Sequence, residues 1–407
     1  MKKIVLSIAG VMAAAAFAPE ASAVPSFARQ TGMACNACHQ QHYPVLNGFG
    51  QAFKAAGYTM MGAQEKVEGE HLSIPNVLNA SMLLKARYVK DDTAGALPGA
   101  NTNTTGNGQW QIPDEFSLFF GGRVAENIGF MFEGNTASPS GLVAGFKMPI
   151  VFDLGSAKLL AVPYLTDALG VGYGFEQSST GAVRGVRWAE HRTDISAQQF
   201  TGIGAGATTG LAFVAINDMG YINFSKWTNA VNLANPGAGA ANNKLSGNYV
   251  RISATPTVGD WAMNIGAQFA SGNVGAVPTP ARATALDFQA QGQAAGKDLS
   301  VYATYAKNDN TVGNYFAAGR KAWSLGADYS VIPHVLHIGA AYLNGTTGAA
   351  IPAGATGTNL DSITVTAVYD LTQNVALHVN HSQRSGNSFA PLATGKQLTT
   401  FLLEAAW

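Results

Sequence analysis

The sequence predicts a mainly β fold, a transmembrane antiparallel β-barrel of about 16 strands that follows a small N-terminal α-helical domain. Two features predict the barrel. Apolar and polar residues alternate with period two, and short connections between these runs alternate with long ones. Composition agrees, because hydrophobic residues make up 47% of the chain and charged residues only 12%, against about 25% in soluble domains. The 24 basic and 24 acidic residues balance, so we expect no nucleic acid as a partner.

The start of the chain has the pattern of an export signal. Lys2 and Lys3 precede an apolar run over 4–18, and small residues end the segment at Ala21-Ser22-Ala23. This predicts a cleaved signal peptide over residues 1–23. The apolar run is too short and too rich in alanine to span a bilayer, which disfavours the alternative of a retained anchor helix. An exported chain with only 2 cysteines cannot rest on a disulfide framework.

The C-terminal part contains the clearest strands. In "DSITVTAVYDL" Ile363 and Val365 fall on one face, and Thr364 and Thr366 on the other. The same parity turns two histidines, His337 and His378, toward the polar face. The last strand alternates as well and ends on an aromatic residue, through Phe401, Leu403, Ala405 and Trp407. An apolar face opposite small and polar side chains is expected where lipid lies outside and a polar lumen inside, whereas a soluble β-sandwich or β-helix is the alternative.

Connection lengths favour the barrel over that alternative. Tight links are predicted near 125–127, 332–334 and 371–373. Long loops rich in Gly, Ala, Asn and Thr are predicted around 92–109, 232–247, 273–285, 344–359 and 383–396. Short turns on one rim and long loops on the other are typical of outer-membrane barrels. We therefore assign residues 76–407 to the barrel and residues 24–75 to a separate domain.

Both cysteines lie in one short motif, Cys35-x-x-Cys38-His39. This spacing is that of covalent c-type haem attachment, in which two thiols form thioethers and the adjacent imidazole becomes an axial iron ligand. A thioredoxin-like pair and half of a zinc site are the alternatives, but the first lacks a βαβ context and the second lacks further ligands at zinc spacing. The motif predicts one covalently bound haem c, held by Cys35 and Cys38 with His39 on its iron.

A short amphipathic helix is predicted after the motif, in "YPVLNGFGQAFKAAGY", with Leu46, Phe49 and Phe53 on one face. That face is expected to pack on the porphyrin or within the small domain. The distal iron ligand stays open among three candidates, Met60, Met61 and His71. A methionine thioether would raise the reduction potential of the haem.

The segment "VPSFARQTGMACNACHQQHYPVLNGFGQAFKAAGYTM" closely resembles the start of the fused outer-membrane monohaem cytochrome–porins of iron(II)-oxidising bacteria. The resemblance covers roughly residues 24–61, and its Phe27 to Gly32 lead-in is more specific than the haem motif alone. It implies a haem domain in or against the barrel lumen, in the outer membrane of a Gram-negative bacterium. It also implies ferrous iron as electron donor and a periplasmic c-type cytochrome as acceptor, and hence an iron(II) oxidase or electron-transfer protein.

Two other functions remain open at this point. One is a diffusion porin that the haem domain plugs, and the other is an electron conduit for a different donor or acceptor. The sequence shows no carboxylate cluster that would identify an iron site. The charged stretch "RGVRWAEHR" (184–192) is assigned no role.

Overall fold

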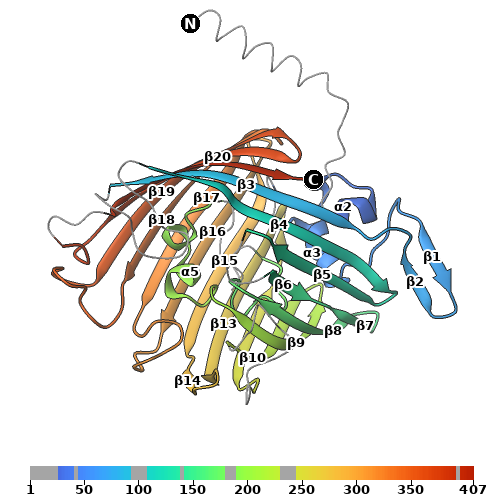
Figure 1. Ribbon diagram of the computed structural model, residues 1–407, viewed down its shortest axis with the longest axis horizontal. Helices are drawn as coiled ribbons and strands as arrows, with labels where there is room; N and C mark the ends of the chain where they lie inside the picture. Colours follow the sequence, from blue (N-terminus) through green and yellow to red (C-terminus); the bar gives the residue numbers. More distant parts are fainter. Residues whose placement is uncertain are drawn as a thin grey trace, which may run out of the picture.

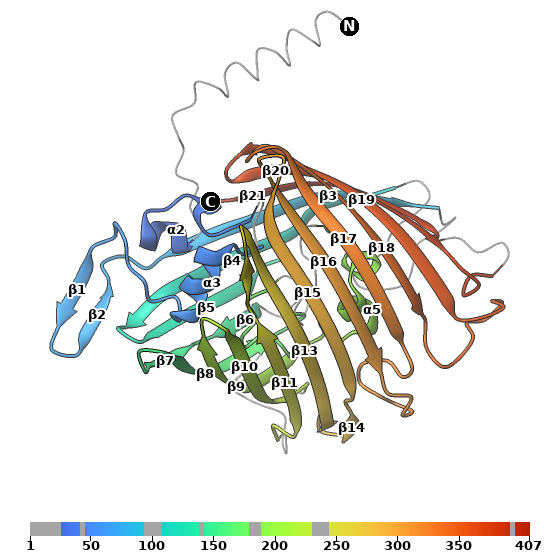
Figure 2. The same ribbon diagram turned by 180° about the vertical axis from the view of Figure 1, so that it is seen from behind.

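The computed structural model describes residues 26–40, 45–92, 108–137, 142–178, 189–229, 244–390 and 395–407, so the predicted signal peptide lies outside the described residues. The predominant element is a closed antiparallel sheet, in which the last strand pairs with the first strand of the wall (Figures 1 and 2). Closure joins Leu398 to Asp91 and Ala406 to Leu83, so the sheet has no unpaired edge. The predicted barrel is confirmed.

The wall has 16 strands when three interrupted strands are each counted once, as predicted. Here β6 and β7 are two parts of one strand, β12 continues β11, and β14 precedes β15. The bounds are β3 (Ala80–Asp91), β4 (Gln109–Ala125), β5 (Ile128–Asn135), β6 (Val143–Lys147), β7 (Ile150–Asp153), β8 (Lys158–Thr166), β9 (Thr208–Asn217), β10 (Gly220–Thr228), β11 (Gly247–Ala254), β12 (Thr257–Val258), β13 (Trp261–Val274), β14 (Thr279–Pro280), β15 (Ala283–Ala294), β16 (Lys297–Asn308), β17 (Lys321–Ile332), β18 (Leu336–Thr346), β19 (Asn359–Thr372), β20 (Val375–Ser385) and β21 (Gln397–Ala406).

The two faces of the wall have opposite chemistry. Ile363 is 57% exposed on the outside, whereas Thr364 is fully buried and faces the lumen. Other strands repeat this, with Phe401 and Leu377 outside and His378 inside. Because every wall strand is paired and the outer face is apolar, the sheet meets the requirement that no backbone group is left unsatisfied in lipid. The chain is thus an outer-membrane porin-like β-barrel in contact with the lipid bilayer, and the predicted localisation is confirmed.

The helices are all short. Among the described residues, none is long and apolar enough to cross a membrane.

Residues 26–75 form what we call the N-terminal segment. It contains α2 (Ser26–Thr31), the 3-10 turn η1 (Cys35–Ala37), α3 (Gly48–Ala55), β1 (Lys66–Gly69) and β2 (Leu72–Pro75). The segment lies at the short-turn rim, near the C-terminus, and the β1–β2 hairpin projects from that rim (Figures 1 and 2). In outer-membrane barrels the short turns face the periplasm.

The predicted helix after the haem motif exists as α3, although it begins after Leu46. Asn47 caps it by accepting a hydrogen bond from the Gly50 N–H at 3.0 Å, and Gly57 follows its end at φ +67°. Phe53 is buried against Phe27, whose ring stacks on Tyr58 at 4.9 Å. Phe49 is 40% exposed, so only part of the predicted apolar face is covered.

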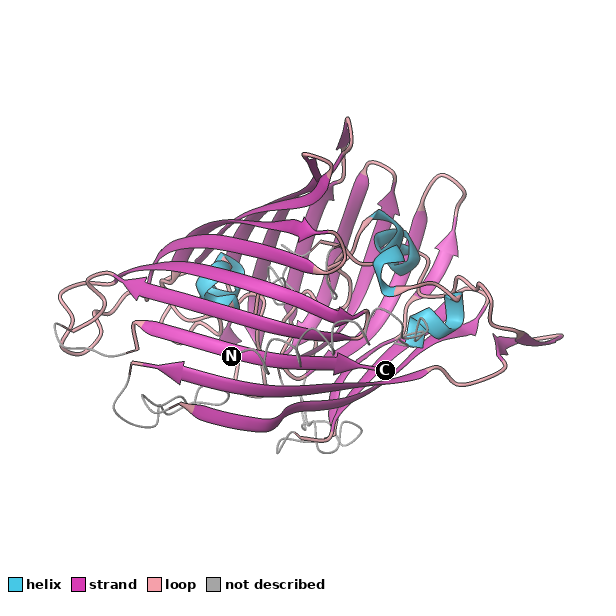
Figure 3. Cartoon of the chain, turned by 90° about the horizontal axis from the view of Figure 1, so that it is seen from above, coloured by secondary structure: helices cyan, strands magenta, loops and turns pink. Residues whose placement is uncertain are grey.

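A second segment, residues 167–207, joins β8 to β9 and folds inward; we call it the insert. It contains α4 (Arg192–Ile195) and α5 (Ala197–Thr201), and residues 179–188 of it lie outside the described residues. Figure 3 shows these helices within the ring of strands, on the side away from α2 and α3. Ala197 and Ile203 are fully buried against the inner wall. The sequence analysis did not predict that this connection would fill part of the lumen.

Candidate functional site

The haem motif folds into a tight turn. Cys35 begins η1, and its carbonyl accepts hydrogen bonds from the backbone N–H of Cys38 at 3.1 Å and of His39 at 3.0 Å. Both cysteines are unpaired and half-buried. Burial raises the pKa of each thiol, whereas redox-active pairs such as thioredoxin's have lowered thiol pKa values. The environment therefore disfavours the thioredoxin-like interpretation of the motif.

The imidazole of His39 is oriented by the backbone. Its Nδ1 lies 3.2 Å from the carbonyl oxygen of Val45, and because a carbonyl only accepts, Nδ1 is the donor. Metal-ligating histidines usually donate one ring N–H to a carbonyl or carboxylate and bind the metal through the other nitrogen. Val45 is itself fixed in a buried cluster with Tyr302 and Ile195. The arrangement fits an axial iron ligand.

Cys38 and His39 border a cavity of about 340 Å³ inside the barrel. The N-terminal segment, the insert and the wall each contribute to it. Its apolar lining includes Phe27, Leu46, Phe53, Tyr58, Phe119 and Leu169. This apolar part of the lining suits a porphyrin, whose faces are apolar. The residues present fit a covalently attached haem.

Charged side chains also line the cavity. Lys85 of β3 lies 3.1 Å from both Glu115 and Glu404, and 3.9 Å from Glu190 of the insert. Burial opposes ionisation of Glu190, but Lys85, Arg192 and Arg87 outweigh it and hold the pKa of this carboxyl well below its usual range. The insert is thus tied to the wall by an ionised glutamate at the edge of the cavity. Glu190 and Arg192 come from the stretch to which the sequence analysis assigned no role.

The predicted distal ligands lie elsewhere. His71 is at the tip of the β1–β2 hairpin with its side chain 92% exposed, and Met60 is 37% exposed at the rim. Neither they nor Met61 are among the described residues that line the cavity. Met131 of β5 and His378 of β20 do line it.

Among the described residues, no group of three or more His, Cys, Asp or Glu side chains could hold a metal ion.

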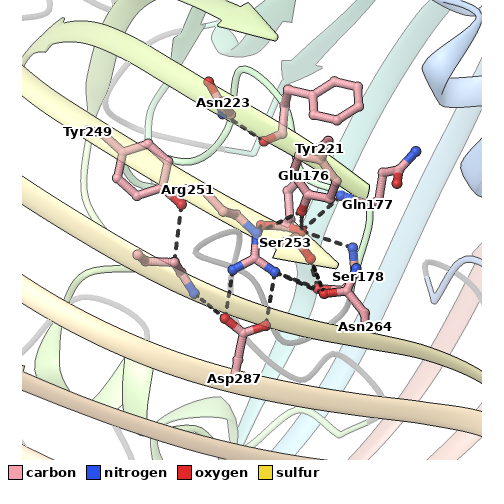
Figure 4. A network of polar contacts seen from close by, with 12 residues as sticks. Glu176, Gln177, Ser178, Tyr221, Asn223, Tyr249, Arg251, Ser253, Asn264 and Asp287 are labelled. Carbon is pink, nitrogen blue, oxygen red and sulfur yellow. Dashed lines mark hydrogen bonds and ion pairs between the residues drawn. The ribbon is translucent and has the colours of Figure 1, made fainter. Parts of the chain in front are cut away.

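A second polar network anchors the insert on the other side of the lumen (Figure 4). Its centre is Arg251 of β11, which is completely buried. Nε of Arg251 lies 2.7 Å from Glu176 of the insert, and its two terminal nitrogens contact the Asp287 carboxylate at 2.6 and 2.9 Å. Ser178 accepts a further hydrogen bond at 3.1 Å, and Tyr221 donates to Glu176 at 2.5 Å. Isolated charges at 176, 251 and 287 gave no sequence signal, because only the fold brings them together.

No protein-family model matches the chain, and no curated protein matches it by sequence. Among solved structures it is similar to the outer-membrane protein OprD of Pseudomonas aeruginosa, at 9% identity and a TM-score of 0.46, over 84% of this chain and 97% of that chain. It is also similar to OmpT of Vibrio cholerae, at 11% identity and 0.46, over 84% and 99%. OccK1 (OpdK) of Pseudomonas aeruginosa gives 11% identity and 0.43, over 81% and 98%. Similarity this low indicates neither family nor function, so the description of the barrel rests on its own geometry.

Proposed function

We propose that this chain is an outer-membrane electron-transfer protein that carries one haem c inside its barrel, bound through Cys35 and Cys38 with His39 on the iron. One observation supports this most: the attachment turn borders a partly apolar cavity in the lumen, and a backbone carbonyl orients His39. When bound, the haem supplies reversible one-electron chemistry. The protein residues attach it, orient the proximal ligand and limit its contact with water.

The donor and acceptor follow from the resemblance. It implies extracellular ferrous iron as donor and a periplasmic c-type cytochrome as acceptor. The position of the N-terminal segment is compatible with this, because it lies at the short-turn rim, which faces the periplasm in such barrels. Oxidising iron outside also keeps ferric precipitates out of the periplasm.

The first test concerns the haem. We expect the purified mature chain to retain haem through denaturing electrophoresis and acid extraction, and the C35A/C38A double variant to lose it completely. The control variant H381Q should keep the haem. It changes a histidine that does not line the cavity and whose Nδ1 contacts the Thr399 hydroxyl. Haem-free wild-type protein from cells that mature other c-type cytochromes would refute the proposal.

The second test concerns the donor. Oxidised protein in detergent is mixed with Fe(II) in a stopped-flow spectrometer, and ferrous haem bands should appear. If the haem stays ferric with Fe(II) but is reduced by another donor, the chain is a conduit for a different substrate.

A diffusion porin is the second candidate, because barrels of 16 strands are wide enough to leave an aqueous channel. If the N-terminal segment only plugs such a channel, its deletion should produce a large conductance in planar bilayers. Since the insert also fills the lumen, we expect that deletion to raise the conductance only modestly.

A further inference from the structure

We propose that Met131 is the second axial ligand of the haem iron, opposite His39. This assignment rests on the proposed function, since it requires a haem at Cys35 and Cys38. Met60, Met61 and His71 were candidates because they are close to the haem motif in sequence, whereas Met131 is assigned from its position in the fold.

The strand that carries Met131 turns it toward the lumen. Its neighbours two residues away face inward as well: Gly129 packs against the Gly57 carbonyl, and Glu133 lines the cavity. Phe132 lies on the other face, where its ring is 6.0 Å from that of Phe120. Met131 is half-buried, packs against the cluster that contains Leu169 and Tyr173, and lines the same cavity as Cys38 and His39.

The other methionine that borders the cavity is less suitable. Met82 is on β3, where the buried Ser81 and Lys85 mark the lumen face. Position 82 has the opposite parity to both, so its side chain belongs to the outer face. Met131 is therefore the one thioether that reaches the cavity from the lumen face among the described residues.

A histidine competes with it. His378 borders the cavity, but its Nε2 lies 3.5 Å from the Glu404 carboxylate. Glu404 in turn contacts Lys85 at 3.1 Å. A haem-ligating histidine normally binds iron through Nε2 while the other nitrogen donates to a neighbour. Here Nε2 is the nitrogen that faces a carboxylate, so the ring has the wrong orientation for an axial ligand.

The chemistry of the ligand gives it a measurable signature. A thioether stabilises ferrous iron and raises the reduction potential relative to ligation by a second histidine. It also produces a sulfur-to-iron charge-transfer absorption in the ferric state. Because leucine is nearly isosteric with methionine, M131L removes the sulfur with little change in packing.

The experiment uses the full-length haem protein in detergent, with M131L and M131H as test variants and M82L as matched control. Haem content is measured first in every sample, by alkaline pyridine spectra. We expect wild type and M82L to show the sulfur-to-iron band, and M131L to lose it, to bind added cyanide or imidazole faster and to have a lower midpoint potential. M131H should give a bis-imidazole spectrum, which serves as the readout if M131L does not fold.

The possible failures are distinguishable. A wild-type protein without covalent haem refutes the proposed function itself. A protein with full haem content refutes only the ligand assignment if wild type lacks the sulfur-to-iron band, if M131L keeps it, or if M131H leaves the spectrum unchanged. If the band is lost in M60L or M61L and kept in M131L, Met60 or Met61 is the ligand and the assignment of Met131 is refuted.

Discussion

Two segments border the cavity and are bound to the wall in different ways. The insert has fully buried residues such as Ala197 and Gln198, and it is anchored through Arg251 on one side and Glu190 on the other. The N-terminal segment contacts the wall through hydrogen bonds, for example Gln291 donating to the Leu46 carbonyl at 3.1 Å, and its haem motif is only half-buried. The insert therefore fixes part of the cavity wall, and the N-terminal segment contributes Cys38 and His39 to its border.

The largest effect should come from the anchor of the insert. R251M removes a completely buried guanidinium and leaves Glu176 and Asp287 without their counter-charge. Breaking a buried ion pair from one side costs about 3–5 kcal/mol. We expect that loss in the free energy of unfolding by urea in detergent micelles, together with a higher single-channel conductance.

The matched control is K307M, which removes an exposed cation from β16. It should change the unfolding free energy by no more than about 0.5 kcal/mol. If R251M has the same unfolding free energy and the same low conductance as K307M, the insert is not held by this network.

A comparable truncation in the N-terminal segment should act locally. F53A removes a buried ring from the cluster with Phe27 and Tyr58, at a cost of about 3 kcal/mol. We expect faster amide hydrogen exchange in α2 and α3, with an unchanged urea midpoint for the barrel. The control F49A alters an exposed ring of the same helix and should leave exchange nearly unchanged. A lower barrel midpoint in F53A would mean that the two segments unfold together.

The insert should also make stability depend on pH through His191. Burial lowers the pKa of this histidine to about 4, and its ring nitrogens contact Ser382 at 2.7 Å and Thr400 at 2.8 Å. Since the unfolded state takes up the proton at about pH 6.5, stability is full above that pH and is lost as pH falls toward 4. The difference amounts to about 3 kcal/mol. Urea unfolding of wild type and H191N at several pH values should show a smaller loss of stability between about pH 6.5 and 4 in H191N than in wild type.

The smallest effect is expected at the cap of α3. N47A removes the acceptor for the Gly50 N–H and the donor to the Ala37 carbonyl, which should cost about 1 kcal/mol of local stability. Gly48 offers a control of opposite sign, since a Cβ there meets no atom within 4 Å and G48A should strengthen the helix. Hydrogen exchange at α3 measures both, and equal rates in N47A and wild type would contradict the capping role.

Much of the wall could be predicted because its signal is local. Ile363 and Thr364 are adjacent in sequence but lie on opposite faces of the wall. Because lipid contacts one face and the polar lumen the other, each strand alternates apolar and polar residues. The tight turn near 332–334 and the long loop near 344–359 also fall where β17, β18 and β19 end and begin. Strand count followed from chain length.

The contents of the lumen could not be predicted in the same way. The helices α4 and α5 of the insert have only 4 and 5 residues, too few for a helical period. Their burial also depends on partners such as Arg384 and Thr304, which are distant in sequence. Met131 lies far along the chain from the haem motif, so nothing but the closed sheet connects them.

The seam between β21 and β3 joins strands from opposite ends of the barrel sequence. The ribosome therefore delivers last the strand that completes the cylinder. No part of the cylinder can therefore be closed until the whole chain has been made, because its first strand pairs with its last.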